Sequence, residues 1–465
     1  MTITNKQYKR KKLVKILLLS ALALSIINYL IGAYANVNLL SLIEFCVTLL
    51  SIFYLDRDFF VEFIYVFIAI VLFAFGVFFC DIQGTYLIEI NKFTGYKNAL
   101  NLALFSNYLL LIGLYFASAH HSAKHKKTAL NAITSDQNIS LGAKNGTNIL
   151  YILCFVIVLI EMYVVFELVS RGSSRSLGIE RMIYSRTIMS SFSRKIKNNL
   201  VLALPLFYHS KGRYKKPLLI IYTSLYVIIM FLSGEKYGPY VRFLYYLLLL
   251  YPAIFTFLKK RVYLFVIAAA GLIGVIYSQY SMLYGYNSSM LIIYLQQRLC
   301  QQGQLWWAIY DKYVGTSPNI NEFIYEIKAC YENTLAFSFP YAGQWKMMYL
   351  AANGSQYVIN KIVNAIPYTM STISSVYYYF GIAGIIIAYP VFGILYSSII
   401  RRTNSSLREE GVITNVLALK LYIMVDYLFC ASDLSALLSV KSLIFILLFA
   451  LFSKYRFKLG AVLIQ

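Results

Sequence analysis

Two stretches decide the fold: LVKILLLSALALSIINYLIGAY at residues 13–34 and VNLLSLIEFCVTLLSIFYL at residues 37–55. Each is a mostly apolar run, long enough for a helix to cross about 30 Å of hydrocarbon. In lipid, only helices and closed barrels satisfy every backbone hydrogen bond, and barrel strands would alternate in polarity, which these runs do not. The sequence therefore predicts an all-α polytopic integral membrane protein.

The same pattern recurs along the chain. Of the 465 residues, 60% are hydrophobic and 13% are charged, about half the charge expected of a water-soluble protein. We expect about twelve membrane spans in a single transmembrane domain over residues 1–465. The expected spans are Leu13–Tyr34, Val37–Leu55, Phe59–Cys80, Ala99–Ala119, Ile149–Val169, Ile188–Tyr208, Pro217–Leu232, Tyr240–Leu258, Val262–Tyr284, Ser374–Ile400, Val412–Phe429 and Leu434–Phe452.

Two of these spans have a second interpretation. The sixth, residues 188–208, carries Arg194, Lys195 and Lys197 in its first half, so we expect it to be short, tilted or partly outside the bilayer. The basic residues 9–12 before the first run and Ala-Tyr-Ala at 33–35 after it also fit a signal peptide. The second run follows at once, which favours a span.

Basic residues set the expected orientation, because short loops rich in Lys and Arg stay in the cytoplasm. They gather on alternate loops: the N-terminal segment, Arg57, 120–147, 210–216, 259–261, 401–408 and 454–458. Both termini are therefore expected in the cytoplasm, and a large loop, residues 285–369, on the opposite side. The net charge of +23 follows mostly from this topology, so we expect no nucleic-acid partner.

Several chemistries lack their sequence motifs. There is no Walker loop, no G-x-G-x-x-G after a strand and no H-E-x-x-H, which argues against nucleotide hydrolysis, a dinucleotide cofactor and a zinc protease. All four histidines lie on the expected cytoplasmic side, three of them in the loop 120–147. That loop is more simply a solvated linker than a metal site. No histidine is then available as a base on the outer side.

The outer loop 170–198 breaks the charge rule. It holds Arg171, Arg175, Arg181, Arg186, Arg194, Lys195 and Lys197 against the single acid Glu180. The planar guanidinium fork suits phosphate and carboxylate groups, so this periplasmic-side loop is a candidate anion site. Solvated side chains that reach lipid headgroups explain the same composition.

An acid and a base stand together after the seventh span, in SGEKYGP at residues 233–239. Gly234, Gly238 and Pro239 allow a tight turn between two helices. Glu235 and Lys236 can serve as base and phosphate contact, or can form a simple ion pair at the membrane surface.

The large outer loop holds all three tryptophans: Trp306, Trp307 and Trp345. Residues 290–313 fit an amphipathic helix, with leucines along one side and Gln and Arg on the other. Aromatic faces beside Gln and Arg suit sugar rings, and an interfacial aromatic belt is the alternative. Cys300 and Cys330 share this loop, where a disulfide is possible in an oxidising compartment. The other four cysteines, Cys46, Cys80, Cys154 and Cys430, lie in or beside spans.

This layout resembles the O-antigen polymerases (Wzy-type) that build bacterial surface polysaccharides. The likeness covers nearly the whole chain. It consists of Tyr- and Phe-rich spans, the basic outer loop, the Gly-acid-Lys turn, and a large late loop with Arg298, Gln301, Gln302, Gln304 and Trp307. These motifs are short and degenerate. The related O-antigen ligases are similar around an outer-face histidine, which this chain lacks.

The resemblance implies a metal-independent glycosyltransferase of the GT-C type in the bacterial inner membrane. It would move a growing glycan from undecaprenyl diphosphate to the terminal sugar of a lipid-linked repeat unit, with a chain-length regulator as a further partner and no cofactor. The candidate catalytic residues are Arg298, Glu235 and Arg186. Lys236, Arg181 and Arg175 are the candidate diphosphate-binding residues. Gln301, Gln304, Trp306 and Trp307 are the candidate sugar-binding residues. Asp311 and Glu332 stand behind Glu235 as candidate bases.

Two other classes remain open. A lipid-linked oligosaccharide flippase or another transporter should carry charges inside its spans and keep its outer loops short; here Lys420, Asp426 and Lys441 lie within the last spans. A membrane O-acyltransferase would usually need a histidine or a comparable base in its site.

Overall fold

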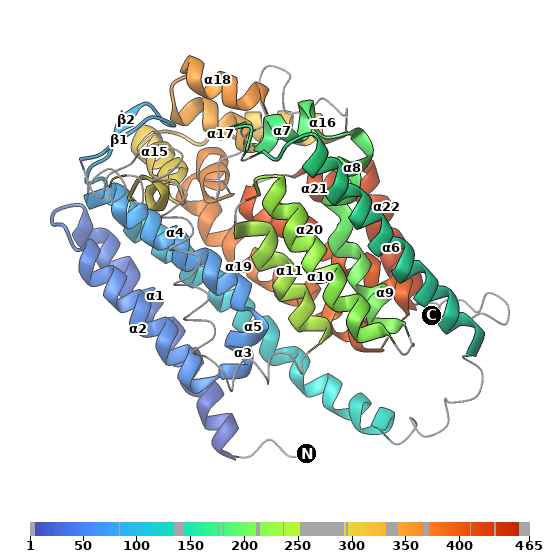
Figure 1. Cartoon of the computed structure of the whole chain (residues 1–465). Coiled ribbons are helices and arrows are strands. Elements are labelled where there is room, and N and C mark those ends of the chain that lie inside the picture. The colour runs from blue at the N-terminus through green and yellow to red at the C-terminus, as the bar shows by residue number, and fades with distance from the viewer. Residues whose placement is uncertain are drawn as a thin grey trace. The chain divides into compact units, whose positions relative to one another are not determined.

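The computed structural model describes residues 5–82, 84–133, 144–174, 176–179, 181–210, 214–235, 237–251, 293, 296–331, 343–364, 366, 372–409, 411–431 and 434–454. This described part is almost entirely helical, with one short hairpin (Figure 1). The predicted span Val262–Tyr284 and the end of Tyr240–Leu258 lie outside it. The chain packs as two compact units, unit 1 (Met1–Asn131, Leu272–Ile399, Met424–Leu443) and unit 2 (Ala132–Gly271, Ile400–Ile423, Ile444–Gln465). The single transmembrane domain expected over residues 1–465 stays a prediction.

Unit 1 contains most of the described elements. They are α1 (Asn5–Gly32), α2 (Asn38–Leu55), α3 (Arg57–Glu62), α4 (Ile64–Ile82), β1 (Tyr86–Leu87), β2 (Lys92–Phe93), α5 (Ala99–Ile133), α15 (Gln304–Tyr313), α16 (Ile320–Tyr331), α17 (Gly343–Ala351), α18 (Gln356–Val363), most of α19 (Thr372–Glu409) and α21 (Ser435–Leu438). Unit 2 contains α6 (Lys144–Ser170), α7 (Arg181–Thr187), α8 (Ser191–Asn199), η2 (Leu200–Ala203), α9 (Leu204–His209), α10 (Lys215–Leu232) and α11 (Tyr237–Leu250). The boundary between the units falls near the end of α5 and inside α19, α20 (Val412–Ala431) and α22 (Val440–Lys454).

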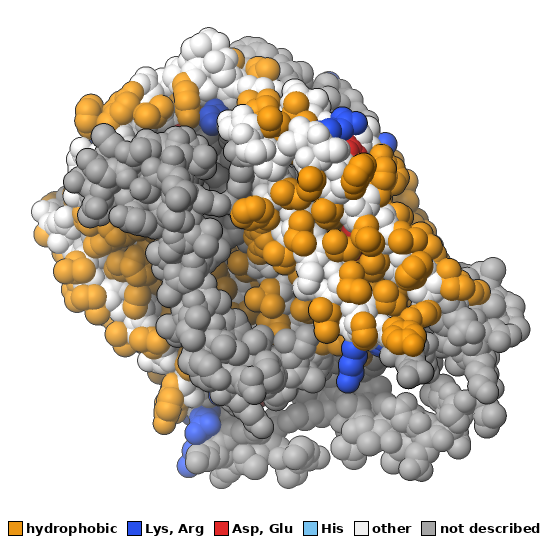
Figure 2. All heavy atoms as spheres, in the orientation of Figure 1, with side chains coloured by type: hydrophobic (Ala, Val, Ile, Leu, Met, Phe, Trp, Pro, Cys, Tyr) orange, Lys and Arg blue, Asp and Glu red, His pale blue; other side chains and the backbone are white. Residues whose placement is uncertain are grey.

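The protein is an all-α polytopic membrane protein, as the sequence predicts. Within the described residues, eight helices are long and apolar enough to cross a membrane, and two shorter apolar helices, Gly238–Leu250 and Val440–Phe452, accompany them. Residues on the outward faces of these helices are apolar and exposed, as lipid contact requires. Figure 2 shows such side chains over the region of α6, α9 and α10, with Lys and Arg side chains at its two ends.

Helix α5 forms the core of unit 1. Of its apolar window 83% is buried, against 28% for α1, so the other helices of the unit pack around it. Gly113 of α5 meets α19 so closely that an added Cβ would lie 2.1 Å from the Pro390 carbonyl oxygen. Such small residues let membrane helices approach without a gap.

The sixth predicted span is broken rather than continuous. Residues 191–209 form α8, the 3₁₀ turn η2 and α9 in succession. The run passes along α10 from one end to the other: Lys197 contacts Glu235 beyond the end of α10, and the Tyr208 carbonyl accepts from Lys215 at its start. The break follows from Pro205, which cannot donate a backbone hydrogen bond, and from Tyr222, whose hydroxyl donates to the Leu200 carbonyl at 2.5 Å.

Other predicted elements also divide. The span Phe59–Cys80 begins as α3 and continues as α4 after Phe63, and Leu434–Phe452 divides into α21 and α22. Helix α19 kinks at Gly381, which has a positive φ of 64°. The predicted helix 290–313 is interrupted by a turn at residues 301–303, before α15 begins at Gln304.

Candidate functional site

Glu235 lies at the centre of an ion cluster in unit 2. Its carboxylate accepts from Arg181 Nη1 at 2.6 Å and from Lys197 Nζ at 2.7 Å, one cation on each oxygen. The side chain of Glu235 is 11% exposed, Lys197 is 5% exposed and Arg181 is 26% exposed. We call Arg181, Lys197 and Glu235 the Glu235 cluster. It carries a net charge of about +1, with Arg181 the member that solvent or a ligand can reach.

The end of α10 places Glu235 in this cluster. The helix ends in a Schellman motif, because the Gly234 amide donates to the Phe231 carbonyl at 3.1 Å and the Glu235 amide donates to the Met230 carbonyl at 2.9 Å. Gly234 takes the left-handed conformation that this motif requires, with φ of 76°. The loop from α6 packs onto the same turn, since the Ser174 amide donates to the Leu232 carbonyl.

A second carboxylate positions Lys197. Glu167, near the end of α6, accepts from the amide and the hydroxyl of Ser190 at 2.8 and 2.9 Å, and from the hydroxyl of Ser193. Ser190 is the N-cap of α8, so Glu167 fixes the start of the helix that carries Lys197. Arg171 completes the arrangement with a contact of 3.3 Å to Glu167.

The electrostatics keep Glu235 ionised. Burial alone would raise the pKa of its carboxyl, but the charges of Lys197 and Arg181, with their hydrogen bonds, hold that pKa below the ordinary value. The ion pair between Glu235 and Lys236 that the sequence allows stays a prediction, because Lys236 lies outside the described residues. An ionised carboxylate with both oxygens in ion pairs is a weak base. Its fitting role is to hold two cations in place.

The tryptophans of the large loop serve packing in unit 1. Trp306 and Trp307 are both fully buried. The Trp306 indole donates to the Ala99 carbonyl at 2.9 Å, and the Trp307 indole donates to Asp81 and to the Gly95 carbonyl, each at 3.0 Å. Neither ring has a free face, so the predicted sugar-binding role does not fit them in this geometry. The continuous burial of Gln304–Tyr310 matches the apolar run Leu305–Tyr310, which signals a helix enclosed on all sides.

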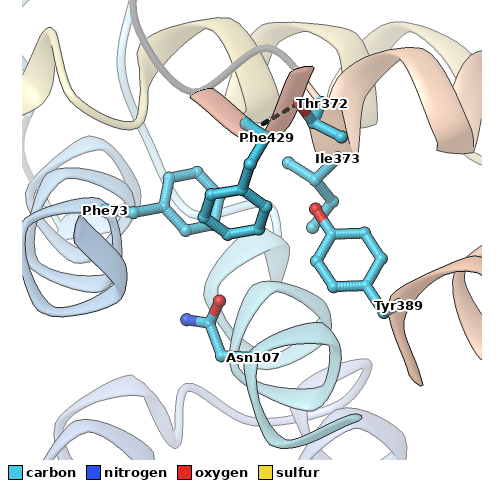
Figure 3. Close-up of a pocket in the computed structure, with 6 residues that line it drawn as sticks. All are labelled: Phe73, Asn107, Thr372, Ile373, Tyr389 and Phe429. Carbon is cyan, nitrogen blue, oxygen red and sulfur yellow. Dashed lines mark hydrogen bonds between the residues drawn. The ribbon is translucent and has the colours of Figure 1, made fainter. Parts of the chain in front are cut away.

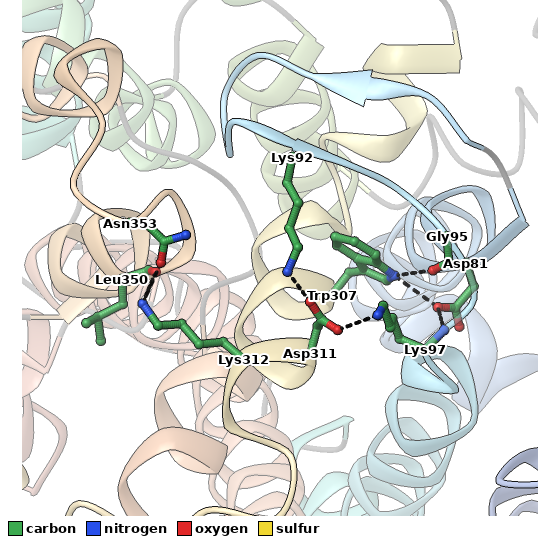
Figure 4. A network of polar contacts seen from close by, with 9 residues as sticks. All are labelled: Asp81, Lys92, Gly95, Lys97, Trp307, Asp311, Lys312, Leu350 and Asn353. Carbon is green, nitrogen blue, oxygen red and sulfur yellow. Dashed lines mark hydrogen bonds and ion pairs between the residues drawn. The ribbon is translucent and has the colours of Figure 1, made fainter.

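Asp81 joins four elements of unit 1. It accepts from the Asn38 side chain, from the amides of Lys97 and Leu100 and from Trp307, and it is buried. These donors satisfy an otherwise costly buried carboxylate. Figure 4 shows Asp81 with Lys97 and Trp307, beside a second network in which Asp311 pairs with Lys92 and, at 2.9 Å, with Lys97.

Asp311 is a further candidate for the base that accepts the acceptor's proton. Its pKa is lowered, because hydrogen bonds and charges of Lys92 and Lys97 outweigh the burial that would raise it. Lys312 bonds instead to the Leu350 carbonyl at 3.0 Å and to the Asn353 side chain at 2.7 Å, and so ties α15 to the end of α17. The Asp311 pairs fasten the loop at residues 84–98 to the large loop.

The remaining predicted site residues divide between units. Arg298 donates to Gln301 at 2.8 Å in unit 1. Gln304 is buried and donates to Glu89, so it too is closed to a sugar. Arg186 is exposed in the last turn of α7 in unit 2. Arg175, Lys236 and Glu332 lie outside the described residues, so the diphosphate site expected on Lys236, Arg181 and Arg175 stays a prediction.

Sequence reasoning missed three features. One is the pairing of Lys197 with Glu235, which a lysine inside a span-like run signals, because such a charge needs a partner. Another is Glu322, which accepts from Lys346 and, at 2.7 Å, from Tyr378. The third is Glu161, discussed below. Cys300 is a free thiol beside Cys80, which excludes the disulfide with Cys330 in this structure.

A small cavity lies in the membrane-spanning part of unit 1. Figure 3 shows its lining, which none of the predicted site residues joins: Phe73, Asn107, Thr372, Ile373, Tyr389 and Phe429. The Asn107 amide nitrogen points into it without a hydrogen-bond partner among the described residues. A buried water is the usual occupant of such a place.

These features define the class as a polytopic α-helical membrane protein with a fixed cation cluster at the end of one helix. Residues 341–446 match a family of unknown function (DUF6418). No curated protein and no solved structure matches the chain. The matched segment begins before α17 and ends in α22, and so contains Lys346 and Tyr378 but not the Glu235 cluster.

Proposed function

We propose that this chain is an O-antigen-type polysaccharide polymerase of the bacterial inner membrane. It transfers a growing glycan from undecaprenyl diphosphate to the terminal sugar of a lipid-linked repeat unit on the periplasmic side. The acceptor hydroxyl oxygen bonds to the anomeric carbon, the bond from that carbon to the diphosphate oxygen breaks, and the diphosphate leaves with the electron pair. A chain-length regulator is the expected protein partner.

The observation that carries this proposal is the Glu235 cluster. A metal-independent transfer must stabilise about two negative charges on the leaving diphosphate with fixed cations. Arg181 is part-exposed, and its remaining N–H groups make no hydrogen bond to any described residue. In our proposal they bind a diphosphate oxygen, while Lys197 adds a buried positive charge behind it.

Glu235 is then a positioning residue. It holds Arg181 and Lys197 at fixed points and so removes the entropy that two long side chains would lose on binding a phosphate. The proton of the acceptor hydroxyl goes to another group or to water. This assignment replaces the expectation that Glu235 itself is the base.

The gene's deletion in its host tests the function directly. A polymerase mutant keeps a lipopolysaccharide band with a single repeat unit and loses the ladder on a gel. Loss of every repeat unit would instead identify the flippase, because no repeat would reach the outer side.

Variants of Arg181 test the cluster. Arg181→Ala should lower polymerisation on the order of a hundredfold, because one fixed donor to the developing charge is lost. Arg181→Lys should rescue poorly, since an ammonium lacks the planar fork. Arg57→Ala is the control, because this exposed arginine lies in a predicted cytoplasmic loop. A normal ladder in Arg181→Ala at normal protein level would exclude Arg181 from the site.

The flippase remains a second candidate because buried acids lie inside the described spans, among them Glu161 and Asp426. Glu161 in α6 and Asp426 in α20 are 0% and 1% exposed. Transporters place ionisable groups at such depths. The gel separates the two functions, as stated above.

A further inference from the structure

Glu161 lies in the middle of a membrane-spanning helix and faces its neighbour. Helix α6 crosses at Ile149–Ser170, and its buried stripe is Cys154, Val158, Glu161 and Val164. These residues recur at helical spacing on the side that packs against α10, while residues between them are exposed and apolar. An acid therefore occupies the centre of an otherwise apolar contact face.

The Glu161 carboxyl group lacks the hydrogen bonds that an ionised carboxylate would need. Glu161 is 0% exposed, and neither carboxyl oxygen has a hydrogen-bond partner among the described residues. Tyr222 and Tyr226 of α10 lie close enough for a charge on Glu161 to act on them. Their hydroxyl protons are used elsewhere, because Tyr222 donates to the Leu200 carbonyl and Tyr226 to the Pro239 carbonyl.

Three basic groups near these helices are engaged elsewhere. On α8, Lys197 pairs with Glu235; at the start of α10, Lys215 donates to the Tyr208 carbonyl; and His209, at the end of α9, contacts Asn415. An ionised carboxylate without a partner in this medium would cost many kcal/mol, so the group takes up a proton instead.

We propose that Glu161 is a proton-binding site in the membrane-spanning part of unit 2, occupied while α6 and α10 are packed and emptied only when their contact opens to water. Proton binding then closes this helix contact, and proton loss opens it. The site serves a polymerase or a transporter alike, because it depends on the burial of the acid and not on the substrate. Its ligand is the proton itself, since the described residues form no group of three or more His, Cys, Asp or Glu side chains that could hold a metal ion there.

The second acid of α6 is a natural control. Glu167 belongs to the same helix, but Ser190, Ser193 and Arg171 satisfy it. It should therefore be ionised under conditions in which Glu161 is neutral.

Infrared spectroscopy of the purified full-length chain in lipid membranes tests the site. Wild-type protein at pH about 7, well above the ordinary glutamate pKa of 4.5, should show the carbonyl stretch of a protonated carboxylic acid. Glu161→Gln and Glu161→Met should lose that band, and Glu167→Gln should keep it. If wild type and both Glu161 variants give the same spectrum in this region, Glu161 is not protonated and the site is excluded.

Hydrogen exchange of α6 and α10 amides tests the link to the helix contact. In wild type, the amide exchange rates, corrected for their intrinsic pH dependence, should increase over the pH range in which the infrared band disappears. In Glu161→Gln, which stays neutral, the same amides should keep constant protection. Equal pH dependence in wild type and Glu161→Gln would overturn the proposed opening, and Glu161→Met serves as the folded reference if the Gln variant is unstable.

Discussion

At the scale of single residues, Glu235 shows how a buried acid changes its chemistry with its partners. Glu161 and Glu235 are both glutamates of unit 2 with little or no exposure. Glu235 meets two cations and stays ionised, whereas Glu161 meets none among the described residues. The same side chain is thus a fixed anion in one place and a neutral acid in the other.

The lowered pKa of Glu235 predicts an acid-sensitive contribution to stability. The folded-state pKa lies below the ordinary 4.5, so this contribution is present above 4.5 and is lost as pH falls through the folded-state value. Near neutral pH, Glu235→Gln should destabilise the protein by roughly 3 kcal/mol, at the low end for a buried ion pair because Arg181 is 26% exposed. Melting temperatures of both proteins, measured in detergent, should converge as the pH falls below 4.5.

An exposed acid provides the comparison for this experiment. Asp58, in the first turn of α3, is exposed, so Asp58→Asn should change the melting temperature little at any pH. A constant gap between wild type and Glu235→Gln from neutral to acid pH would show that the ion pairs contribute nothing to stability.

At the scale of elements, the turn after α10 makes the Glu235 cluster possible. A Cβ on Gly234 would lie 2.3 Å from the Ser174 hydroxyl oxygen, and its φ of 76° strains any other residue. Gly234→Ala should therefore cost about 1–3 kcal/mol and displace Glu235 from Arg181. Gly238→Ala is the matched control, since nothing lies within 4 Å of its added Cβ, and alanine in α11 should be neutral or stabilising. Gly234→Ala should lower the melting temperature, and Gly238→Ala should leave it unchanged or raise it. Equal melting temperatures for the two variants would contradict the Schellman geometry.

The docking of α15 on α4 rests on two glycines in contact. An added Cβ on Gly303 would lie 2.3 Å from the Val77 amide nitrogen and 2.6 Å from the Gly76 carbonyl carbon, both backbone atoms that cannot move aside. Gly303→Ala should cost about 1–3 kcal/mol by overpacking. It should also shift tryptophan emission to longer wavelength, because Trp306 and Trp307 are fully buried beneath this contact.

The control for this contact lies in the neighbouring loop. Gly84 has open space around its added Cβ, so Gly84→Ala should leave both the melting temperature and the tryptophan emission unchanged. Unchanged emission in Gly303→Ala would mean that α15 does not depend on this glycine pair.

The sequence predicts elements well where apolar length alone decides them. The predicted span Pro217–Leu232 and the observed α10, Lys215–Leu232, end at the same residue, because the apolar run ends there. Pro205 is a local signal for the break at η2, but the Tyr222 hydroxyl that also contributes to it lies 22 positions from Leu200. The pairing of Glu235 with Arg181 and Lys197 likewise spans 54 and 38 positions, distances at which local pattern carries no information. The burial of Glu161 can be predicted from the sequence, because it follows Cys154 and Val158 at helical spacing.

At the scale of the whole molecule, each unit separates its charges between two ends. In unit 1, β2 and α15 meet through Lys92 and Asp311 at the end where α4 finishes and α5 begins. In unit 2, Glu235 and Lys197 lie beyond one end of α10 and Lys215 lies at the other. The expected topology requires the same assignment in both units: the Asp311 and Glu235 ends outside, and the basic ends at Arg57 and Lys215 in the cytoplasm.

Cysteine labelling tests that assignment one unit at a time. In a background without reactive native cysteines, Ser317→Cys in unit 1 and Lys195→Cys in unit 2, both exposed, should react with a membrane-impermeant maleimide in intact spheroplasts. Lys126→Cys of α5 and Lys216→Cys of α10 should react only after the membrane is permeabilised, because loops rich in Lys and Arg stay inside. Reaction of Ser317→Cys and Lys126→Cys from the same side would contradict the spans of unit 1. If Ser317→Cys and Lys195→Cys react from opposite sides, the large loop and the Glu235 cluster cannot share one substrate, and the proposed polymerase site fails whatever the gel shows.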